Sequence, residues 1–430
     1  MDTRFTDGNT MYCQHRFELP LDHNHPDSGS ITLFAREVVD IKRQDEDLPW
    51  LVYLQGGPGF PSPRPEGQSG WLKRALQQYR VLLLDQRGTG NSSPITHQTL
   101  AHMDGKLQAD YLKHFRADNI VRDAEAIRQQ LGVTSWALLG QSFGGFCALT
   151  YLSFYPQSLS RVYMTGGVPP IHGHPDKVYQ ATYQRVWDKN QAFFAHFPQA
   201  QMHCRKIADY LIDNDVRLPN GQRFTVEQFQ LIGINLGRSH AHLPMYYLLE
   251  SAFVTCNGKE TLSYGFLNAM LAEQAYQTNP IYAILHESIY CQQEASLWSA
   301  QRVREQYPVF NYQKGAPFYF TGEMVYPWMF EQLDCLKPLK HAAEQLAEET
   351  DWPALYDTDT LSRNQVPVSC AVYAEDMYVE MNYSLETLQG IPNSKAWLTN
   401  EYEHNGLRED GERILDKLIA QADYIANTTR

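Results

Sequence analysis

The sequence predicts an α/β protein in which helices flank a mostly parallel sheet and a large, mostly helical segment interrupts the core. Over the first 170 residues, short apolar runs that end in glycine or polar residues alternate with stretches of helical periodicity. Strand signals then fade and return only at residue 366. We therefore expect a core made of residues 1–170 and 351–430, with residues 171–350 forming a helical cap domain.

The expected elements can be placed in order along the chain. Two extended segments flank a turn-rich stretch at residues 23–30 and predict a hairpin at the sheet edge, whereas the later apolar runs predict buried parallel strands. Strands are expected at residues 17–21, 31–39, 50–54, 79–84, 136–139, 161–165, 366–373 and 395–399. Helices are expected at residues 118–131, 179–194, 342–349 and 411–426.

Composition limits the possible partners. The chain has 430 residues, of which 43% are hydrophobic, and a net charge of −13, which disfavours nucleic acid and anionic membrane surfaces. Seven cysteines are scattered without a CxxC pair, as is typical of reduced thiols. The first ten residues are polar, and no run of about 18 apolar residues occurs. We expect a cytoplasmic protein.

The segment around Ser142 predicts a catalytic nucleophile. Residues 140–144 read Gly-Gln-Ser-Phe-Gly and stand between an apolar strand and a helix, which is the setting of a nucleophile elbow. The sharp turn leaves room only for small neighbours, and glycines surround the serine. The alternative is a glycine-rich turn with an incidental serine, which the setting between a strand and a helix disfavours.

A nucleophilic serine needs a base and an acid, which in such a fold follow it in the order acid, then histidine, near strand ends. Asp376 follows the 366–373 strand, and His404 follows the 395–399 strand. Ser142, Asp376 and His404 therefore form the expected catalytic triad. Glu375 stands beside Asp376 and remains an alternative for the acid.

An oxyanion requires backbone N–H donors from the residue after the nucleophile and from an earlier glycine-rich loop. Phe143 and Gly57 fit these positions. The loop at 55–59 lacks the lysine of a P-loop and the spacing of a dinucleotide fingerprint. The segment 85–88, Asp-Gln-Arg-Gly, is interpreted as structural support that ties neighbouring loops together.

Taken together, these motifs resemble those of the proline iminopeptidases, or prolyl aminopeptidases, of the α/β-hydrolase superfamily, and the length resembles the larger bacterial form. The resemblance spans nearly the whole chain and implies an α/β-hydrolase fold, release of N-terminal proline from peptides, and no cofactor. One departure is visible, because Gln55 replaces the histidine that usually begins the family's loop. The resemblance rests on segments 56–59, 85–92, 140–145, 375–378 and 404–406.

An aminopeptidase must also recognise a cationic N-terminus, which a carboxylate in the cap can bind. The resemblance supports glutamates from the cap in this role. Two acidic residues lie within apolar and aromatic stretches, although acidic residues are also common on solvated helices. The expected substrate contacts are Glu287 and Glu323, with Tyr290, Tyr326 and Trp328 as walls for the proline ring.

Metal binding is not expected, because the pairs His172–His174 and His240–His242 lack a further ligand at a recognisable spacing. The leading function is a serine aminopeptidase acting through an acyl-enzyme on Ser142. A carboxylesterase with the same triad and a cap for neutral substrates remains an alternative. A catalytically silent binding protein is disfavoured because all three triad residue types are present. The oligomeric state and the substrate range beyond proline stay open.

Overall fold

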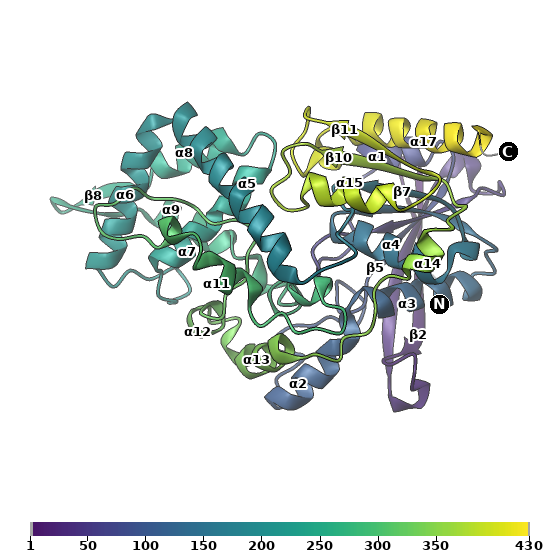
Figure 1. Ribbon diagram of the computed structural model, residues 1–430, viewed down its shortest axis with the longest axis horizontal. Helices are drawn as coiled ribbons and strands as arrows, with labels where there is room; N and C mark the ends of the chain where they lie inside the picture. Colours follow the sequence, from purple (N-terminus) through teal and green to yellow (C-terminus); the bar gives the residue numbers. More distant parts are fainter. Residues whose placement is uncertain (1–2, 429–430) are drawn as a thin grey trace.

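The structure, a computed structural model, describes residues 3–428. Figure 1 shows two parts, a sheet covered by helices and a separate layer of helices coloured teal to green. The chain builds most of the sheet first, crosses into the second layer after residue 165, and returns to the sheet at residue 368. The second layer is called the cap below. No helix within residues 3–428 combines the length and apolarity needed to cross a membrane.

The central sheet has nine strands in the order β1-β2-β3-β5-β4-β6-β7-β10-β11. The strands from β5 to β11 in this order are parallel, and β1, β2 and β3 are antiparallel additions at one edge. Crossover helices between parallel strands place all their carboxyl ends at one edge. The bounds are β1 Thr3–Asp7, β2 Thr10–Pro20, β3 Ser30–Asp40, β4 Trp50–Leu54, β5 Arg80–Asp85, β6 Trp136–Gln141, β7 Leu159–Thr165, β10 Val368–Tyr373 and β11 Ser394–Thr399.

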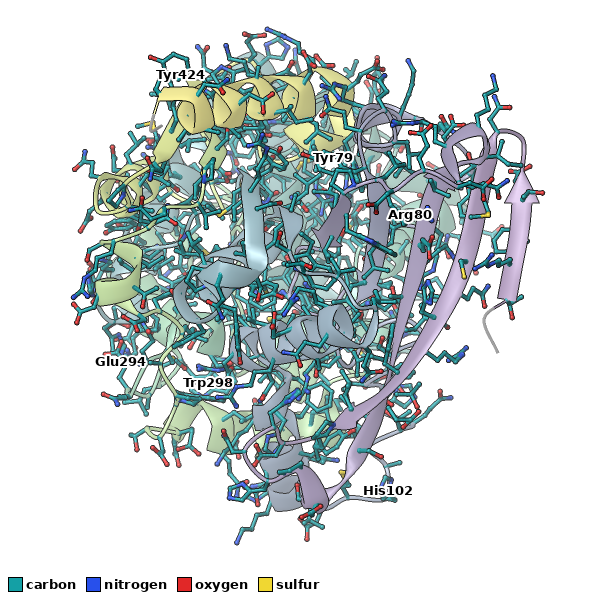
Figure 2. The ribbon with its side chains drawn as sticks, turned by 90° about the vertical axis from the view of Figure 1, so that its right-hand side faces the viewer. Tyr79, Arg80, His102, Glu294, Trp298 and Tyr424 are labelled. Carbon is teal, nitrogen blue, oxygen red and sulfur yellow. The ribbon has the colours of Figure 1, made fainter. Side chains whose placement is uncertain are left out.

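The expected amino-terminal hairpin is confirmed, and it is longer than the sequence pattern indicates. Strands β2 and β3 pair in continuous register from Thr10↔Asp40 to Pro20↔Ser30. Strand β1 adds an outermost strand that the sequence analysis missed, because its side chains are all exposed and show no apolar alternation. Figure 2 shows these strands at the right-hand edge of the sheet.

Helices cover both faces of the sheet. On one face, α1 and α17 pack together over a core that includes Leu83, Leu139 and Ile414. On the other face, α3 and α4 cover a core that continues into the cap. The helices of this part are α1 Gly70–Ala75, α2 Gly105–Leu112, α3 Ala117–Gln130, α4 Phe143–Phe154, α14 Thr358–Leu361, α15 Met381–Gln389, α16 Gly406–Glu409 and α17 Gly411–Thr428.

The cap is mostly helical, as expected, and it carries one small hairpin that the sequence analysis did not predict. Strands β8 (Phe253–Cys256) and β9 (Lys259–Leu262) pair with each other and are mostly exposed, so they carry no apolar pattern. The cap helices are α5 Pro175–His196, α6 Pro198–Asp213, α7 Val226–Gln230, α8 His242–Glu250, α9 Tyr264–Ala272, α10 Ile281–Ile284, α11 Ser299–Arg304, α12 Met329–Gln332 and α13 Lys340–Glu348.

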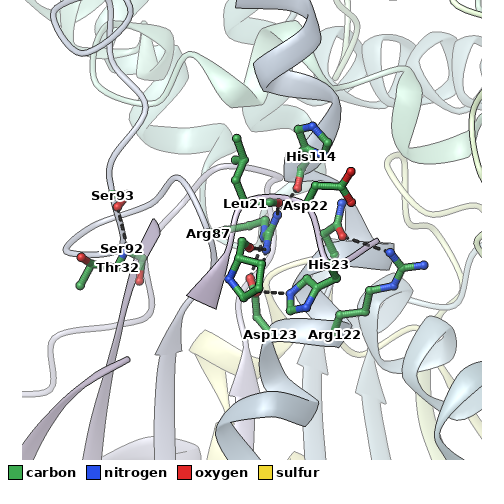
Figure 3. Close-up of polar contacts among 12 residues, drawn as sticks. Leu21, Asp22, His23, Thr32, Arg87, Ser92, Ser93, His114, Arg122 and Asp123 are labelled. Carbon is green, nitrogen blue, oxygen red and sulfur yellow. Dashed lines mark hydrogen bonds and ion pairs between the residues drawn. The ribbon is translucent and has the colours of Figure 1, made fainter. Parts of the chain in front are cut away.

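The interpretation of segment 85–88 as structural support is confirmed. The buried Arg87 forms an ion pair with Asp123 of α3, with Nη2 2.6 Å from Oδ1. The same guanidinium donates to the backbone oxygens of Leu21 and His114, and His23 also bonds Asp123 at 2.8 Å (Figure 3). One arginine thus links the β2–β3 turn, β5 and α3.

A second buried arginine joins the core to the cap. Arg116, which precedes α3, is completely buried and donates hydrogen bonds of 2.8 Å to the backbone oxygens of Ser288, Cys291 and Pro353. Its guanidinium also lies over the Trp352 ring, 4.4 Å from the centroid. These contacts connect the cap to the return segment that leads back to the sheet.

Candidate active site

Ser142 occupies the turn between β6 and α4, at the carboxyl edge of the sheet. Its backbone has φ 54° and ψ −128°, a conformation that non-glycine residues rarely adopt. Such strain costs about 1–3 kcal/mol and persists only where the surroundings enforce it. The backbone N–H of Ser142 donates to the oxygen of Thr165, and its own oxygen accepts from Gly145 at 2.7 Å. These bonds hold the turn in place.

Close packing around this turn explains the glycines beside Ser142. A Cβ at Gly144 would stand 1.9 Å from the backbone oxygen of Leu54, and one at Gly145 would stand 2.2 Å from that of Gly167. No side chain fits at such distances. The start of α4 can therefore lie against the end of β4 and the segment after β7 only with glycine at both positions.

Asp376 and His404 meet beside the turn. His404 Nδ1 lies 2.7 Å from Asp376 Oδ2, and the other oxygen of Asp376 accepts from the backbone N–H groups of Tyr378 and Val379. Because the carboxylate occupies Nδ1, Nε2 is the ring nitrogen of His404 that is left for proton transfer. Glu375, the alternative acid, is largely exposed and pairs with Lys189 instead.

The electrostatics of His404 suit a general base. Burial disfavours the charged ring, but the carboxylate of Asp376, by its charge and hydrogen bond, outweighs this effect and raises the pKa of His404 above its ordinary value. Glu323 contributes in the same direction, while Arg238 opposes it. An imidazole with a raised pKa is a stronger base when neutral.

Ser142 and His404 open into one cavity of about 210 Å³ between the sheet edge and the cap. Residues of the core, of the cap and of the segments after β10 and β11 line this cavity. They include Gln55, Gly56, Gly57, Phe60 and Gln141 of the core, Ile234, Arg238, Met270, Glu273, Tyr276, Tyr282 and Glu323 of the cap, and Tyr378, Asn405 and Arg408.

The glycine-rich loop after β4 lies against the nucleophile. A Cβ at Gly56 would stand 2.8 Å from Ser142 Cβ, so the backbone of this loop approaches the serine directly. Gly57 lines the cavity with φ 134°, and Phe143 begins α4. Gln55 turns its side chain toward Tyr53, whose hydroxyl donates to Gln55 Oε1 at 3.0 Å.

Of the expected cap contacts, the structure brings Glu323 to the cavity. The hydroxyl of Tyr282 donates to Glu323 Oε1 at 2.5 Å, and both residues line the cavity. Glu323 is half-buried, whereas the second cavity glutamate, Glu273, is exposed at the rim. The carboxylate of Glu323 therefore faces the inside of the cavity.

The expectation for Glu287 is corrected. Its buried carboxylate accepts hydrogen bonds from the backbone N–H groups of Ser299 and Ala300, at 2.9 and 2.8 Å, where α11 begins. Burial raises the pKa of Glu287 despite these bonds. Glu287 thus caps a helix, and it does not line the cavity of Ser142 as the structure describes it.

The aromatic walls expected from the sequence are also corrected, since none of the three lines this cavity as described. Tyr326 is buried, and its hydroxyl lies 2.8 Å from that of Tyr183. Trp328 stacks on Tyr326, with ring centroids 5.7 Å apart, and Tyr290 packs against Phe146. The aromatic residues that do line the cavity are Phe60, Tyr276, Tyr282 and Tyr378. Of these, only Tyr378 belongs to a motif singled out from the sequence.

The histidine pairs have local roles in the cap. His174 accepts from the backbone N–H of Asp176 and bonds the oxygen of Ala295, and His242 bonds the oxygen of Leu236. Within residues 3–428, one group of metal-type side chains occurs at Cys13, His15 and Glu37. The Glu37 carboxylate there already bonds His15 and Arg80.

The chain is similar to known proteins along most of its length. Residues 49–244 match the family model of the alpha/beta hydrolase fold. A proline iminopeptidase of Aeromonas sobria is 60% identical over 412 residues, which cover 95% of this chain and 96% of the relative. A proline iminopeptidase of Aspergillus aculeatus is 38% identical over 419 residues, covering 94% of this chain and 92% of that protein.

Proposed function

The chain belongs to the proline iminopeptidase family of the α/β-hydrolase superfamily, and we propose that Ser142, Asp376 and His404 carry out its reaction. The protein is a serine aminopeptidase that releases N-terminal proline from peptides. The observation that supports the site assignment is the carboxylate of Glu323 inside the same cavity as Ser142 and the Asp376–His404 pair.

In the proposed reaction, His404 Nε2 accepts the proton of Ser142 Oγ as this oxygen attacks the prolyl carbonyl carbon. The developing oxyanion accepts hydrogen bonds from the backbone N–H groups of Gly57 and Phe143. The peptide C–N bond then breaks, and His404 donates its proton to the leaving amine. Water, activated by His404, hydrolyses the prolyl ester and releases proline. Throughout, Asp376 orients the ring and stabilises its charged form.

Glu323 is the proposed anchor for the prolyl ammonium group. A carboxylate and an ammonium form a charge-assisted hydrogen bond, and Tyr282 holds the first oxygen of Glu323 so that the second is available to the substrate. The aromatic rings of Phe60 and Tyr282, with centroids 5.0 Å apart, offer a flat surface to the pyrrolidine ring. An endopeptidase substrate has no charged amine to offer this carboxylate.

The domain division and the compartment are also proposals. We assign residues 1–170 and 351–430 to the hydrolase core and 171–350 to the cap, supported by the end of β7 at Thr165 and the start of β10 at Val368. We infer a cytoplasmic location because all seven cysteines are free thiols. The net charge of −13 supports peptides rather than nucleic acid as partners.

Three substrates test this function: proline β-naphthylamide, its N-acetylated analogue, and p-nitrophenyl acetate. We expect fast cleavage of the first and cleavage of the blocked analogue slower by about two orders of magnitude, because the charged amine is lost. Ser142→Ala should lower kcat on the first by about three to six orders of magnitude, while Ser251→Ala, an exposed cap serine, should not change it. Cleavage of the ester without cleavage of proline β-naphthylamide would identify a carboxylesterase instead.

A further inference from the structure

Two arginines line the cavity of Ser142 and His404 and have no role in the proposed reaction. Arg238 follows the short helix η5 (Leu231–Gly237), and Arg408 lies on α16. Both are exposed, and neither forms an ion pair with a carboxylate within residues 3–428. Arg238 Nη1 donates to the side-chain oxygen of Asn235 at 2.9 Å, a neutral partner. Their positive charges therefore remain available at the mouth of the cavity.

Arg238 is fixed beside His404 by the hydrogen bonds of its two neighbours. The backbone oxygen of Gly237 accepts from the N–H of His404 at 3.3 Å. On the other side, the N–H of Ser239 donates to Asn405 Oδ1 at 2.7 Å, and its hydroxyl accepts from the N–H of Glu403 at 3.1 Å. The segment around Arg238 thus runs along residues 403–405.

Arg408 reaches the same side of the site from the helix that follows His404. Its backbone N–H donates to the oxygen of Asn405 at 2.8 Å, in the turn that begins α16. The two arginines come from the cap and from the core, and both line the cavity into which His404 opens. Glu323 lines the same cavity from the cap and is bonded to Tyr282, whose ring packs against Phe60.

The reaction determines which part of the substrate comes near the arginines. His404 must give its proton to the nitrogen of the leaving group, so the residue after proline lies on the His404 side. In a dipeptide, the C-terminal carboxylate is attached to the carbon next to that nitrogen. We propose that Arg238 and Arg408 form a subsite for this carboxylate and that the enzyme prefers free dipeptides beginning with proline. This inference rests on the proposed function.

The acidic groups around the arginines bond other residues, and none forms an ion pair with either guanidinium in the part of the chain that the structure describes. Glu273 at the rim bonds Asn235, and Glu409 bonds Asn405 and lies 3.6 Å from His240. Glu403 is held by Lys189. The cavity therefore offers a carboxylate to the substrate's ammonium group and guanidinium groups to its carboxylate, which matches the zwitterion of a dipeptide.

The test compares the dipeptide Pro-Ala with Pro-Ala amide, which differ only in the terminal charge, and uses proline β-naphthylamide as a neutral reference. At a pH on the upper plateau of the pH profile, we expect the wild type to show a kcat/KM about tenfold higher for the acid than for the amide. Arg238→Gln and Arg408→Gln should each lower kcat/KM for Pro-Ala by about 2- to 5-fold, so that the two arginines together account for the tenfold preference. The kcat/KM for the amide and for the β-naphthylamide should change less than that for the acid, so that the acid-to-amide ratio falls in each variant.

Arg223→Gln is the matched control, because Arg223 is an exposed cap arginine that lines other cavities and not that of Ser142. Raising the salt concentration should also reduce the acid-to-amide ratio of the wild type, since exposed charges are screened. If both arginine variants lose kcat/KM equally for Pro-Ala and for Pro-Ala amide, the carboxylate subsite is overturned. The arginines would then act only through the electrostatics of His404. Wild-type protein that does not cleave proline β-naphthylamide would overturn the proposed function as well.

Discussion

Lys189 on α5 of the cap lies 2.5 Å from Glu403 Oε1, and the same ammonium lies 3.3 Å from Glu375 Oε2. Glu403 immediately precedes His404, and Glu375 immediately precedes Asp376. One buried lysine of the cap is therefore bonded to both loops that carry the proposed base and acid. Burial raises the pKa of Glu403, and Lys189 counteracts part of this effect.

Replacing this lysine should disturb the alignment of the triad. We expect Lys189→Met to lower kcat on proline β-naphthylamide by about tenfold with little change in KM, because both loops lose a charged hydrogen bond. Lys189→Arg should retain most of the activity. Lys206→Met, which breaks an exposed cap ion pair with Glu260, is the control. A variant with a lower melting temperature but normal kcat would assign Lys189 a purely structural role.

The pH dependence of kcat/KM should report His404. The base must be neutral, and Asp376 raises the pKa of His404 above its ordinary value of about 6.5. Activity should therefore rise with pH through a midpoint above about 6.5. In Asp376→Asn, the remaining effect of burial should move this midpoint downward, and kcat should fall by about four orders of magnitude. A wild-type midpoint below about 6 would contradict the geometry of the Asp376–His404 pair.

The two cap glutamates should respond oppositely to the same substitution. Glu323→Gln should lower kcat/KM for proline β-naphthylamide by about 10- to 100-fold and leave p-nitrophenyl acetate hydrolysis nearly unchanged, because only the amide substrate carries the ammonium group. Glu287→Gln should keep this selectivity and lower the melting temperature, since Glu287 caps α11. If Glu287→Gln instead lowers kcat/KM for proline β-naphthylamide without changing ester hydrolysis, Glu323 is not the anchor of the substrate's ammonium group.

The contact between core and cap through Arg116 should be costly to remove. Arg116→Met would leave the backbone oxygens of Ser288, Cys291 and Pro353 buried without this donor. We expect the free energy of unfolding to fall by about 3–5 kcal/mol, measured by urea denaturation. Arg122→Met, which removes a weaker contact to Asn119 on the same helix, should cost less than about 1 kcal/mol. If both variants lose a similar free energy of unfolding, the contacts of Arg116 do not join the core to the cap.

The three residues proposed as the triad each have local signals in the sequence. A glycine-flanked serine between a strand and a helix, an acid after a strand and a histidine after the next strand are patterns within a few residues. The structure also separates Asp376 from Glu375, a choice that depends on which side chain turns inward after β10. No pattern along the chain contains that information.

The cap contacts were harder to predict because the cap packs through residues distant in sequence. Glu287 and Glu323 have similar neighbours in the chain, yet one meets the start of α11 and the other meets Tyr282. Tyr326 was expected at the substrate and instead bonds Tyr183, far away in sequence. Aromatic residues serve equally well in a core and in a binding wall, so only the tertiary arrangement distinguishes the two uses.

The return of the chain to the sheet after the cap has a consequence for biosynthesis. A ribosome completes the strand and turn that present Ser142 long before it synthesises β10 and β11, whose ends carry Asp376 and His404. Until then, the growing chain holds a serine without its base, and the edge of β7 that later pairs with β10 is uncovered. Products of interrupted translation should therefore lack peptidase activity, and the exposed edge of β7 makes them targets for chaperones and proteases.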